Sequence, residues 1–129
     1  MTSQYKIIIN PMGAVRTTQA GKFADKRYRR YREYKTELRL LLKQIGIHKC
    51  PPRFIIKFVL PFPVSYTERK KDLLRGKPHT QKPDLDNLVK GFMDCFGTDD
   101  SGVHAITMLK VWGDEGKIIL GIEEKDITL

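Results

Sequence analysis

The segment between Asp84 and Gly97 constrains the fold of this chain more than any other, because its apolar side chains recur with helical spacing. They fall at i, i+3, i+4, i+7, i+8 and i+11, which places them on one face of a helix: Leu85, Leu88, Val89, Phe92, Met93 and Phe96. Asp84 stands where a helix N-cap belongs, and Gly97 suits the helix end. A helix with this apolar face needs a sheet or another helix to cover it.

A second, longer helix is predicted from Asp25, as its N-cap, to Ile45, with Gly46 closing it. Apolar residues recur along this segment at alternating three- and four-residue steps, so we expect one shared buried face: Tyr31, Tyr34, Leu38, Leu41 and Ile45.

Four segments have the composition of strands: residues 5–9, 53–60, 103–112 and 117–122. Gly113–Gly116 separates the last two and predicts a hairpin. Residues 64–82 are polar and basic, and predict a long loop. The order strand, helix, strand, helix, strand, strand indicates an α/β (α+β) fold. We expect a single domain over residues 1–129, with a mixed β-sheet and two main helices packed on it.

The chain has 129 residues, the usual size of one domain. Its apolar runs fall far short of the roughly 20 residues that a membrane helix needs. Its first residues lack the basic-then-apolar order of a secretory signal. Cys50 and Cys95 are far apart and form no C-x-x-C pattern, which argues against a thiolate zinc site and favours reduced cysteines. We therefore expect a cytoplasmic protein that does not associate with membranes.

The net charge of +9 is divided unevenly along the chain. Up to Lys82 there are 20 Lys and Arg against five acids, a net charge of +15. From Pro83 onward there are four Lys against ten acids, a net charge of −6. Such asymmetry favours a polyanionic partner for the first part. Composition alone leaves DNA, RNA and a membrane surface open as that partner.

Carboxylates flank the helix that opens at Leu85. Asp84 and Asp86 stand at its start, and Asp99 and Asp100 follow its end. If the chain reverses and brings them together, their mutual repulsion calls for a divalent cation, and oxygen ligands suit Mg²⁺ or Mn²⁺. The helix's own length, however, separates its two ends. Lys90, one turn beyond Asp86, is placed either to pair with that carboxylate or to stabilise charge on a phosphate undergoing substitution.

Simpler interpretations of the same residues remain open. Asp84 can serve only as a helix cap, and Asp86 only as a first-turn acid that complements the helix dipole. Lys90 and Asp86 can form only a surface i,i+4 pair. The position of these acids directly after a strongly basic segment favours a functional role for them.

Residues 82–90, read as K-P-D-L-D-N-L-V-K, together with Asp99-Asp100-Ser101, resemble the signature of RusA-type Holliday-junction resolvases, which are phage- and prophage-associated endodeoxyribonucleases. The resemblance extends to residues 78–81 and 110–116. It covers roughly residues 58–123, and the Arg69-Lys70-Lys71 run resembles the basic loop of that family.

This resemblance implies that Asp84, Asp86 and Asp100 are metal-binding catalytic carboxylates, with Asp100 favoured over Asp99, and that Lys90 is an essential lysine. It implies Mg²⁺ or Mn²⁺ as cofactor, a homodimer, and branched DNA as partner. The basic residues outside the signature then become candidate phosphate contacts: Arg16, Arg69, Lys70, Lys71, Arg75 and Lys77.

The leading hypothesis is therefore a structure-selective endodeoxyribonuclease that resolves four-way junctions by paired, Mg²⁺-dependent hydrolysis during DNA recombination and repair. The alternative is a non-catalytic basic module that binds nucleic acid, in which the acids only cap and solubilise a helix.

Overall fold

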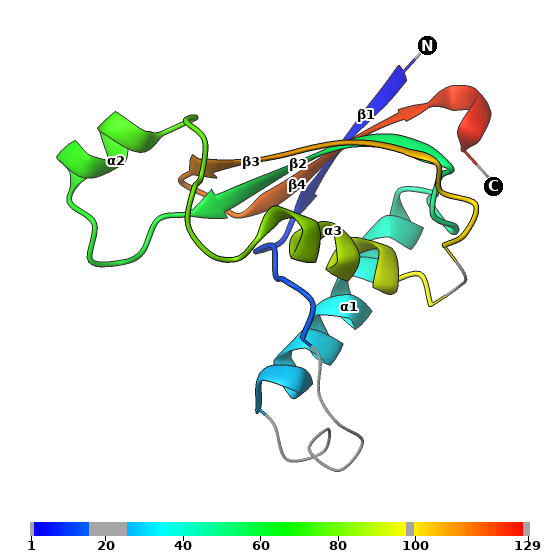
Figure 1. Ribbon diagram of the computed structural model, residues 1–129, viewed down its shortest axis with the longest axis horizontal. Helices are drawn as coiled ribbons and strands as arrows, with labels where there is room; N and C mark the ends of the chain where they lie inside the picture. Colours follow the sequence, from blue (N-terminus) through cyan, green and yellow to red (C-terminus); the bar gives the residue numbers. More distant parts are fainter. Residues whose placement is uncertain (1, 16–25, 98–99, 128–129) are drawn as a thin grey trace.

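The computed structural model describes residues 2–15, 26–97 and 100–127, which form one α+β unit (Figure 1). Within them, three helices and a short 3₁₀ turn accompany one mixed sheet of four strands. In chain order the elements are β1 (Thr2–Ile8), α1 (Lys26–Gln44), β2 (Arg53–Pro61), α2 (Glu68–Leu74), α3 (Leu85–Asp94), β3 (Ala105–Gly113), β4 (Lys117–Glu123) and η1 (Glu124–Asp126). The predicted fold class is confirmed. Asp25, the predicted cap of α1, lies outside the described residues.

The strand order in the sheet is β1-β4-β2-β3, which corrects the predicted hairpin. β3 and β4 do not pair with each other, because β2 lies between them, parallel to β3 and antiparallel to β4. A Gly-Asp-Glu-Gly turn indicates that the chain reverses direction. It does not indicate whether the two strands that it connects pair with each other or have a third strand between them. β2 takes this central place because it is strongly apolar and gains hydrogen bonds along both edges.

The link between β3 and β4 passes tightly around the end of the sheet. A Cβ atom on Gly113 would stand 2.4 Å from Val59 Cγ1, and one on Gly116 would stand 2.0 Å from Asn10 Oδ1. Both distances are below van der Waals contact, so this path requires glycine at the two positions.

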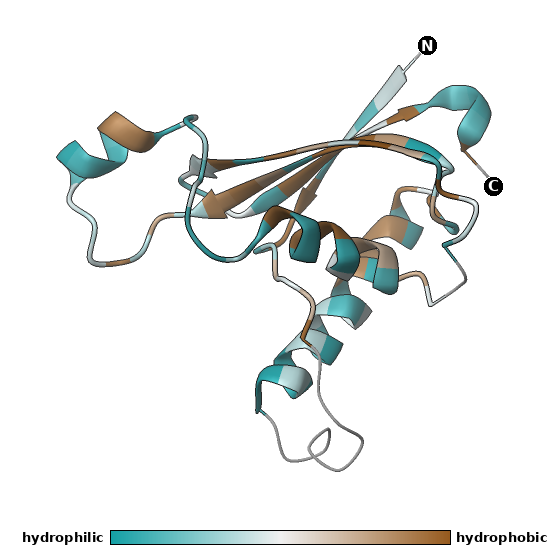
Figure 2. Cartoon of the chain, in the orientation of Figure 1, coloured by the Kyte–Doolittle hydropathy of each residue, from teal (hydrophilic) through white to brown (hydrophobic). Residues whose placement is uncertain are grey.

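The core lies between the sheet and α1 and α3, which cover the same face of it (Figure 1). Figure 2 shows that hydrophobic residues lie along the strands and on the sides of the helices that face them. The predicted inward face of β2 is confirmed: Phe54, Ile56, Phe58 and Leu60 are all buried. The predicted stripe of α3 is also confirmed in its centre, where Leu88, Val89 and Phe92 are buried.

The face of α1 differs from the prediction at its C-terminal end. Tyr31, Tyr34 and Leu38 are buried as predicted, but the next buried residue is Leu42, whereas Leu41 is only half-buried and Ile45 is exposed. The helix ends at Gln44, one residue before Ile45, and Gly46 follows with a left-handed φ of 88°. Ile45 therefore leaves the helical stripe.

Residues 62–79 form an extension that we call the arm, and its helix α2 corrects the prediction of an unstructured loop. Thr67 caps α2 by accepting a hydrogen bond from Lys70 N at 3.2 Å. Figure 1 shows α2 projecting beyond the end of the sheet, away from α1. A seven-residue helix lacks the long apolar period that sequence reading relies on, and α2 has no buried residue.

The arm returns along β3 and is fastened to it. Gly76 N donates to Trp112 O at 2.9 Å, Trp112 N donates to Lys77 O at 3.0 Å, and His79 N donates to Lys110 O at 3.1 Å. Trp112 is buried, and the His79 ring centroid lies 4.1 Å from it. The arm is therefore anchored to β3 by backbone hydrogen bonds. None of the helices in the described part of the chain is long and apolar enough to cross a membrane.

Candidate active site

Asp84 occupies the N-cap position of α3, but its carboxylate does not act as a cap. Its backbone is extended, with φ −66° and ψ 144°, and its side chain makes no capping hydrogen bond. Instead Asp84 Oδ2 pairs with Lys82 Nζ at 3.0 Å, and the carboxylate side chain is 58% exposed. The capping interpretation thus accounts for the backbone here and leaves the carboxylate available to a ligand.

Asp86 lies in the first turn of α3 and is also exposed. Its Oδ1 accepts a hydrogen bond from Asn87 N at 2.9 Å. Asp84 and Asp86 therefore both present exposed carboxylates at the N-terminus of α3, where the helix dipole favours negative charge.

Asn87 connects this helix start to the segment that follows β1. Its side-chain Nδ2 donates to Ala14 O at 2.8 Å, and Ala14 N donates to Asn87 O at 3.1 Å. The approach is close, since a Cβ atom on Gly91 would stand 2.9 Å from Met12 O. Residues 12–15 are thereby held on α3. Arg16, which follows them and was predicted to bind DNA, lies outside the described residues.

Lys90 is one turn beyond Asp86 but pairs with Asp94. The distance from Lys90 Nζ to Asp94 Oδ1 is 3.1 Å. Asp94 Oδ2 also accepts a hydrogen bond from Tyr31 OH at 2.8 Å. Burial, followed by this carboxylate, raises the pKa of Tyr31 above its ordinary value, so the phenol stays a donor. The surface pair between Lys90 and Asp86, one of the interpretations left open by the sequence, is not formed. Asp94 instead holds the ammonium end of Lys90, whose side chain remains partly exposed.

Asp100 lies at the opposite end of α3. Ten residues of helix, about 15 Å at 1.5 Å per residue, separate Asp84 from the segment that carries Asp100. Burial, and then the neighbouring Asp100 carboxylate, raise the pKa of the Cys50 thiol to about 12. No group of three His, Cys, Asp or Glu side chains able to hold a metal forms among residues 2–15, 26–97 and 100–127. The structure thus places Asp84 and Asp86 at one end of α3 and Asp100 beyond the other end.

Lys110 is a residue that sequence reasoning missed as part of the site. Its Nζ donates to the carbonyl oxygens of Gln81 and of Pro83, the latter at 2.6 Å. It thereby fixes the backbone that leads into Asp84, including the cis peptide bond between Lys82 and Pro83. A signal was present: strand alternation places Lys110 on the helix-facing side of β3, where a lysine needs partners.

The predicted DNA contacts on the arm fall into two groups. Arg75 is engaged within the protein: its guanidinium binds Asp114 at 2.7 and 2.9 Å and Asp72 at 2.8 Å, and this contact lowers the pKa of Asp114. Lys71 pairs with Glu68 at 3.4 Å.

The other arm cations remain available to a ligand. Lys70 Nζ lies 3.8 Å from the centroid of the Tyr66 ring. In the part of the chain that the structure describes, neither Arg69 nor Lys77 has an ion pair, and both are exposed. Lys70, Arg69 and Lys77 therefore offer positive charge to a phosphate backbone.

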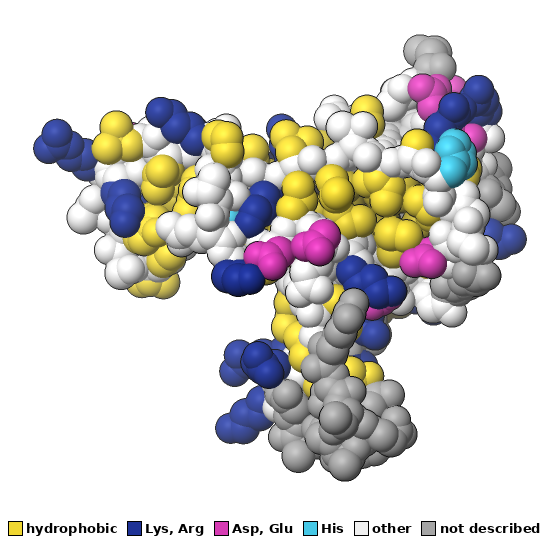
Figure 3. All heavy atoms as spheres, in the orientation of Figure 1, with side chains coloured by type: hydrophobic (Ala, Val, Ile, Leu, Met, Phe, Trp, Pro, Cys, Tyr) yellow, Lys and Arg dark blue, Asp and Glu magenta, His cyan; other side chains and the backbone are white. Residues whose placement is uncertain are grey.

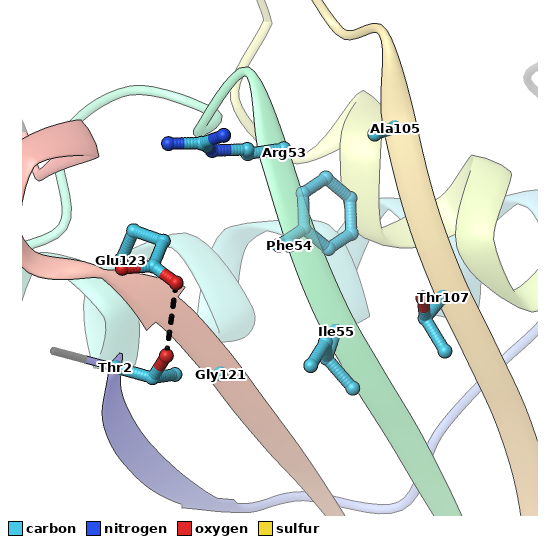
Figure 4. A pocket seen from close by; sticks show the side chains of 8 residues that line it. All are labelled: Thr2, Arg53, Phe54, Ile55, Ala105, Thr107, Gly121 and Glu123. Atoms are coloured by element: carbon cyan, nitrogen blue, oxygen red, sulfur yellow. Dashed lines mark hydrogen bonds between the residues drawn. The ribbon is translucent and has the colours of Figure 1, made fainter.

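A shallow hollow on the opposite face of the sheet does not belong to this site (Figure 4). Thr2, Phe54, Ile55 and Thr107 are among its lining residues, and Thr2 Oγ1 donates to Glu123 Oε1 at 3.1 Å across one side of it. It lacks the paired carboxylates of α3.

Comparison with known proteins gives a family match. A family model described as endodeoxyribonuclease RusA matches residues 9–123, which include α3, the arm and all four residues predicted to be catalytic. A search of curated proteins gave no match to the chain.

Proposed function

The chain belongs to the RusA endodeoxyribonuclease family, and on that premise we propose that it is a structure-selective nuclease that resolves Holliday (four-way) junctions in recombination and repair. The observation that carries the proposal is the pair of exposed carboxylates at the start of α3, with the basic arm beside them. Asp84 makes no capping bond, so capping does not account for its side chain. The cations of the arm would hold the phosphate backbone while the carboxylates face it.

Asp84 and Asp86 fit a hard divalent cation, Mg²⁺ or Mn²⁺. Their oxygen donors are of the type these ions prefer, and Mg²⁺ is commonly held by one or two carboxylates together with water and substrate phosphate. When bound, such an ion activates water and neutralises charge on the scissile phosphate. Lys90, kept in place by Asp94 at 3.1 Å, would offer a further positive charge to that phosphate.

We expect a homodimer, as the family resemblance implies, and the free edge of β3 supports it. Among the described residues, no strand pairs with this edge between Ala105 and Leu109. Met108 and Leu109 are 41% and 39% exposed there, and Figure 3 shows hydrophobic side chains in a band between β3 and α3, next to acidic ones. An open apolar strand edge is a template for pairing.

Antiparallel pairing of β3 with its copy around a two-fold axis would satisfy this edge in both subunits. It would also bring Asp100 of the partner subunit toward the α3 N-terminus, the region from which Asp100 of the same chain is absent. Sedimentation or light scattering tests the interface. Met108→Lys should yield monomers, whereas Ile8→Lys, which changes a 50% exposed residue of β1, should not.

Cleavage of a synthetic four-way junction tests the function. The wild type should introduce paired nicks in opposed strands with Mg²⁺ or Mn²⁺ and leave linear duplex intact. Asp86→Asn should abolish the nicks while junction binding in a gel-shift assay persists. Glu37→Gln, a matched loss of an exposed carboxylate on α1, should cleave normally. Binding by the wild type without cleavage, with either metal, would instead support the non-catalytic nucleic-acid-binding module.

A further inference from the structure

The tip of the arm carries an apolar side chain that nothing in the fold covers. Val64 is fully exposed, whereas no other large apolar side chain in the described ranges is more than 62% exposed. Pro63 and Ser65 on either side of it are exposed as well. A valine in this position contributes nothing to core packing, so its effect on folding is small. We therefore expect its role to lie in contacts between the arm and a ligand.

The tip is held rigidly despite its exposure. Residues 63–66 form a turn closed by a hydrogen bond from Tyr66 N to Pro63 O at 3.1 Å. The flanking rings of Phe62 and Tyr66 both pack on the buried Trp112, with centroid distances of 5.5 and 5.7 Å, and the Phe62 ring lies within 8° of parallel. The turn therefore stands on a fixed aromatic base and presents Val64 outward.

Cationic side chains lie against this base. Lys70 Nζ lies 3.8 Å from the centre of the Tyr66 ring. The guanidinium of Arg75, which is paired with Asp72 and Asp114, lies 5.8 Å from the centre of the Phe62 ring. Arg69 and Lys77, both exposed, lie on the same arm. An exposed apolar side chain flanked by basic residues is typical of a nucleic-acid-binding surface. The basic residues bind phosphates while the apolar side chain enters between bases.

The arm and the carboxylates are built on the same strand. Trp112, which supports the tip, and Lys110, which holds the backbone before Asp84, are two residues apart on β3. The distance between the tip and the cleavage site is consequently fixed by the sheet. A contact made by the tip at one point of a substrate would set which phosphate reaches Asp84 and Asp86.

We propose that Pro63 and Val64 form a wedge that enters the branch point of a four-way junction and separates the bases stacked there. The proposal rests on the proposed function for its substrate. Bases at a branch point lack the continuous stacking of a duplex, so their separation costs less there than within linear DNA. The wedge thereby favours the junction and places the strand to be cut.

Junctions with 2-aminopurine at the branch point test the wedge, because this base fluoresces more strongly when it is unstacked. The full-length wild type, bound in Ca²⁺ to separate binding from cleavage, should increase the fluorescence. Val64→Ser should lose most of the increase and, in Mg²⁺, cleave about tenfold more slowly, with duplex binding unchanged. Leu73→Ser, a matched change at the 62% exposed Leu73 of α2, should behave as the wild type.

An unchanged fluorescence increase in Val64→Ser, or an equal loss in Leu73→Ser, would overturn the wedge. The two proposals fail in different ways. A wild type that binds junctions but does not cut them refutes the nuclease, while the fluorescence comparison still decides the wedge. A wild type that does not bind junctions overturns both.

Discussion

Replacing Asn87 by Asp is expected to destabilise the protein by about 2 kcal/mol, because it reverses the polarity of the contact between α3 and residues 12–15. The native amide donates to Ala14 O at 2.8 Å, and this bond is partly buried. Loss of such a bond costs roughly 1 kcal/mol, and a part-buried carbonyl left without a donor adds about 1–3 kcal/mol. The new carboxylate lies in the first turn of α3, where its favourable interaction with the helix dipole offsets roughly 0.5 kcal/mol of this loss.

Urea unfolding followed by circular dichroism measures this change, and two further variants isolate its cause. Asn87→Ala removes the same donor, but it adds no carboxylate to repel the carbonyl oxygen of Ala14, and water can enter the space beside that carbonyl. We therefore expect a smaller loss, about 1–2 kcal/mol. Gln4→Glu converts an exposed amide to a carboxylate on β1 and should stay within about 0.5 kcal/mol of the wild type. The reasoning is refuted if Asn87→Asp is as stable as the wild type, or more stable than Asn87→Ala.

Three further outcomes are expected. Phe92→Ala should cost about 3–5 kcal/mol in urea unfolding, since Phe92 is fully buried; a loss below about 1 kcal/mol would contradict the core packing. Lys110→Met should slow junction cleavage about tenfold or more with binding retained, because the backbone before the carboxylates loses its donor; normal cleavage would exclude that positioning role. Burial chiefly raises the pKa of both Cys50 and Cys95 to about 12 from an ordinary 9.0. The native state then retains protons that the unfolded state releases, so the free energy of unfolding should fall as pH rises from 9 toward 12, and a double Cys→Ala variant should flatten that decline.

The helices and the central strand could be predicted because their patterns are local. The spacing from Leu85 to Phe96 identifies α3 and its buried face, and the alternation from Phe54 to Leu60 identifies the inward face of β2. Strand order is not local in this sense. Gly113 and Gly116 signal a reversal of the chain, but the insertion of β2 between β3 and β4 depends on pairing across the sheet, which no single segment encodes.

The candidate site was predictable in its residue types and less so in its geometry. Asp84 and Asp86 both lie at the start of α3 because Asp84 is its N-cap residue and Asp86 belongs to its first turn. The placement of Asp100 depends on the length and direction of α3 relative to the chain that follows, and a single sequence does not supply that direction. Arg75 illustrates a further limit, since a basic residue engaged by Asp72 and Asp114 has the same local sequence signature as one that faces solvent.

The central place of β2 also governs how a newly made chain reaches this structure. Synthesis from the N-terminus completes the apolar β2 segment well before β3 and β4 have been made. Until then neither edge of β2 has its pairing partner. β3 and β4 cannot assemble first as a local hairpin, because the link from Gly113 to Gly116 must leave room for the strand between them. Every pairing of the central strand therefore joins residues distant along the chain, which slows folding. We therefore expect the nascent chain to be most prone to aggregation while β2 is exposed and its C-terminal partners have not yet emerged.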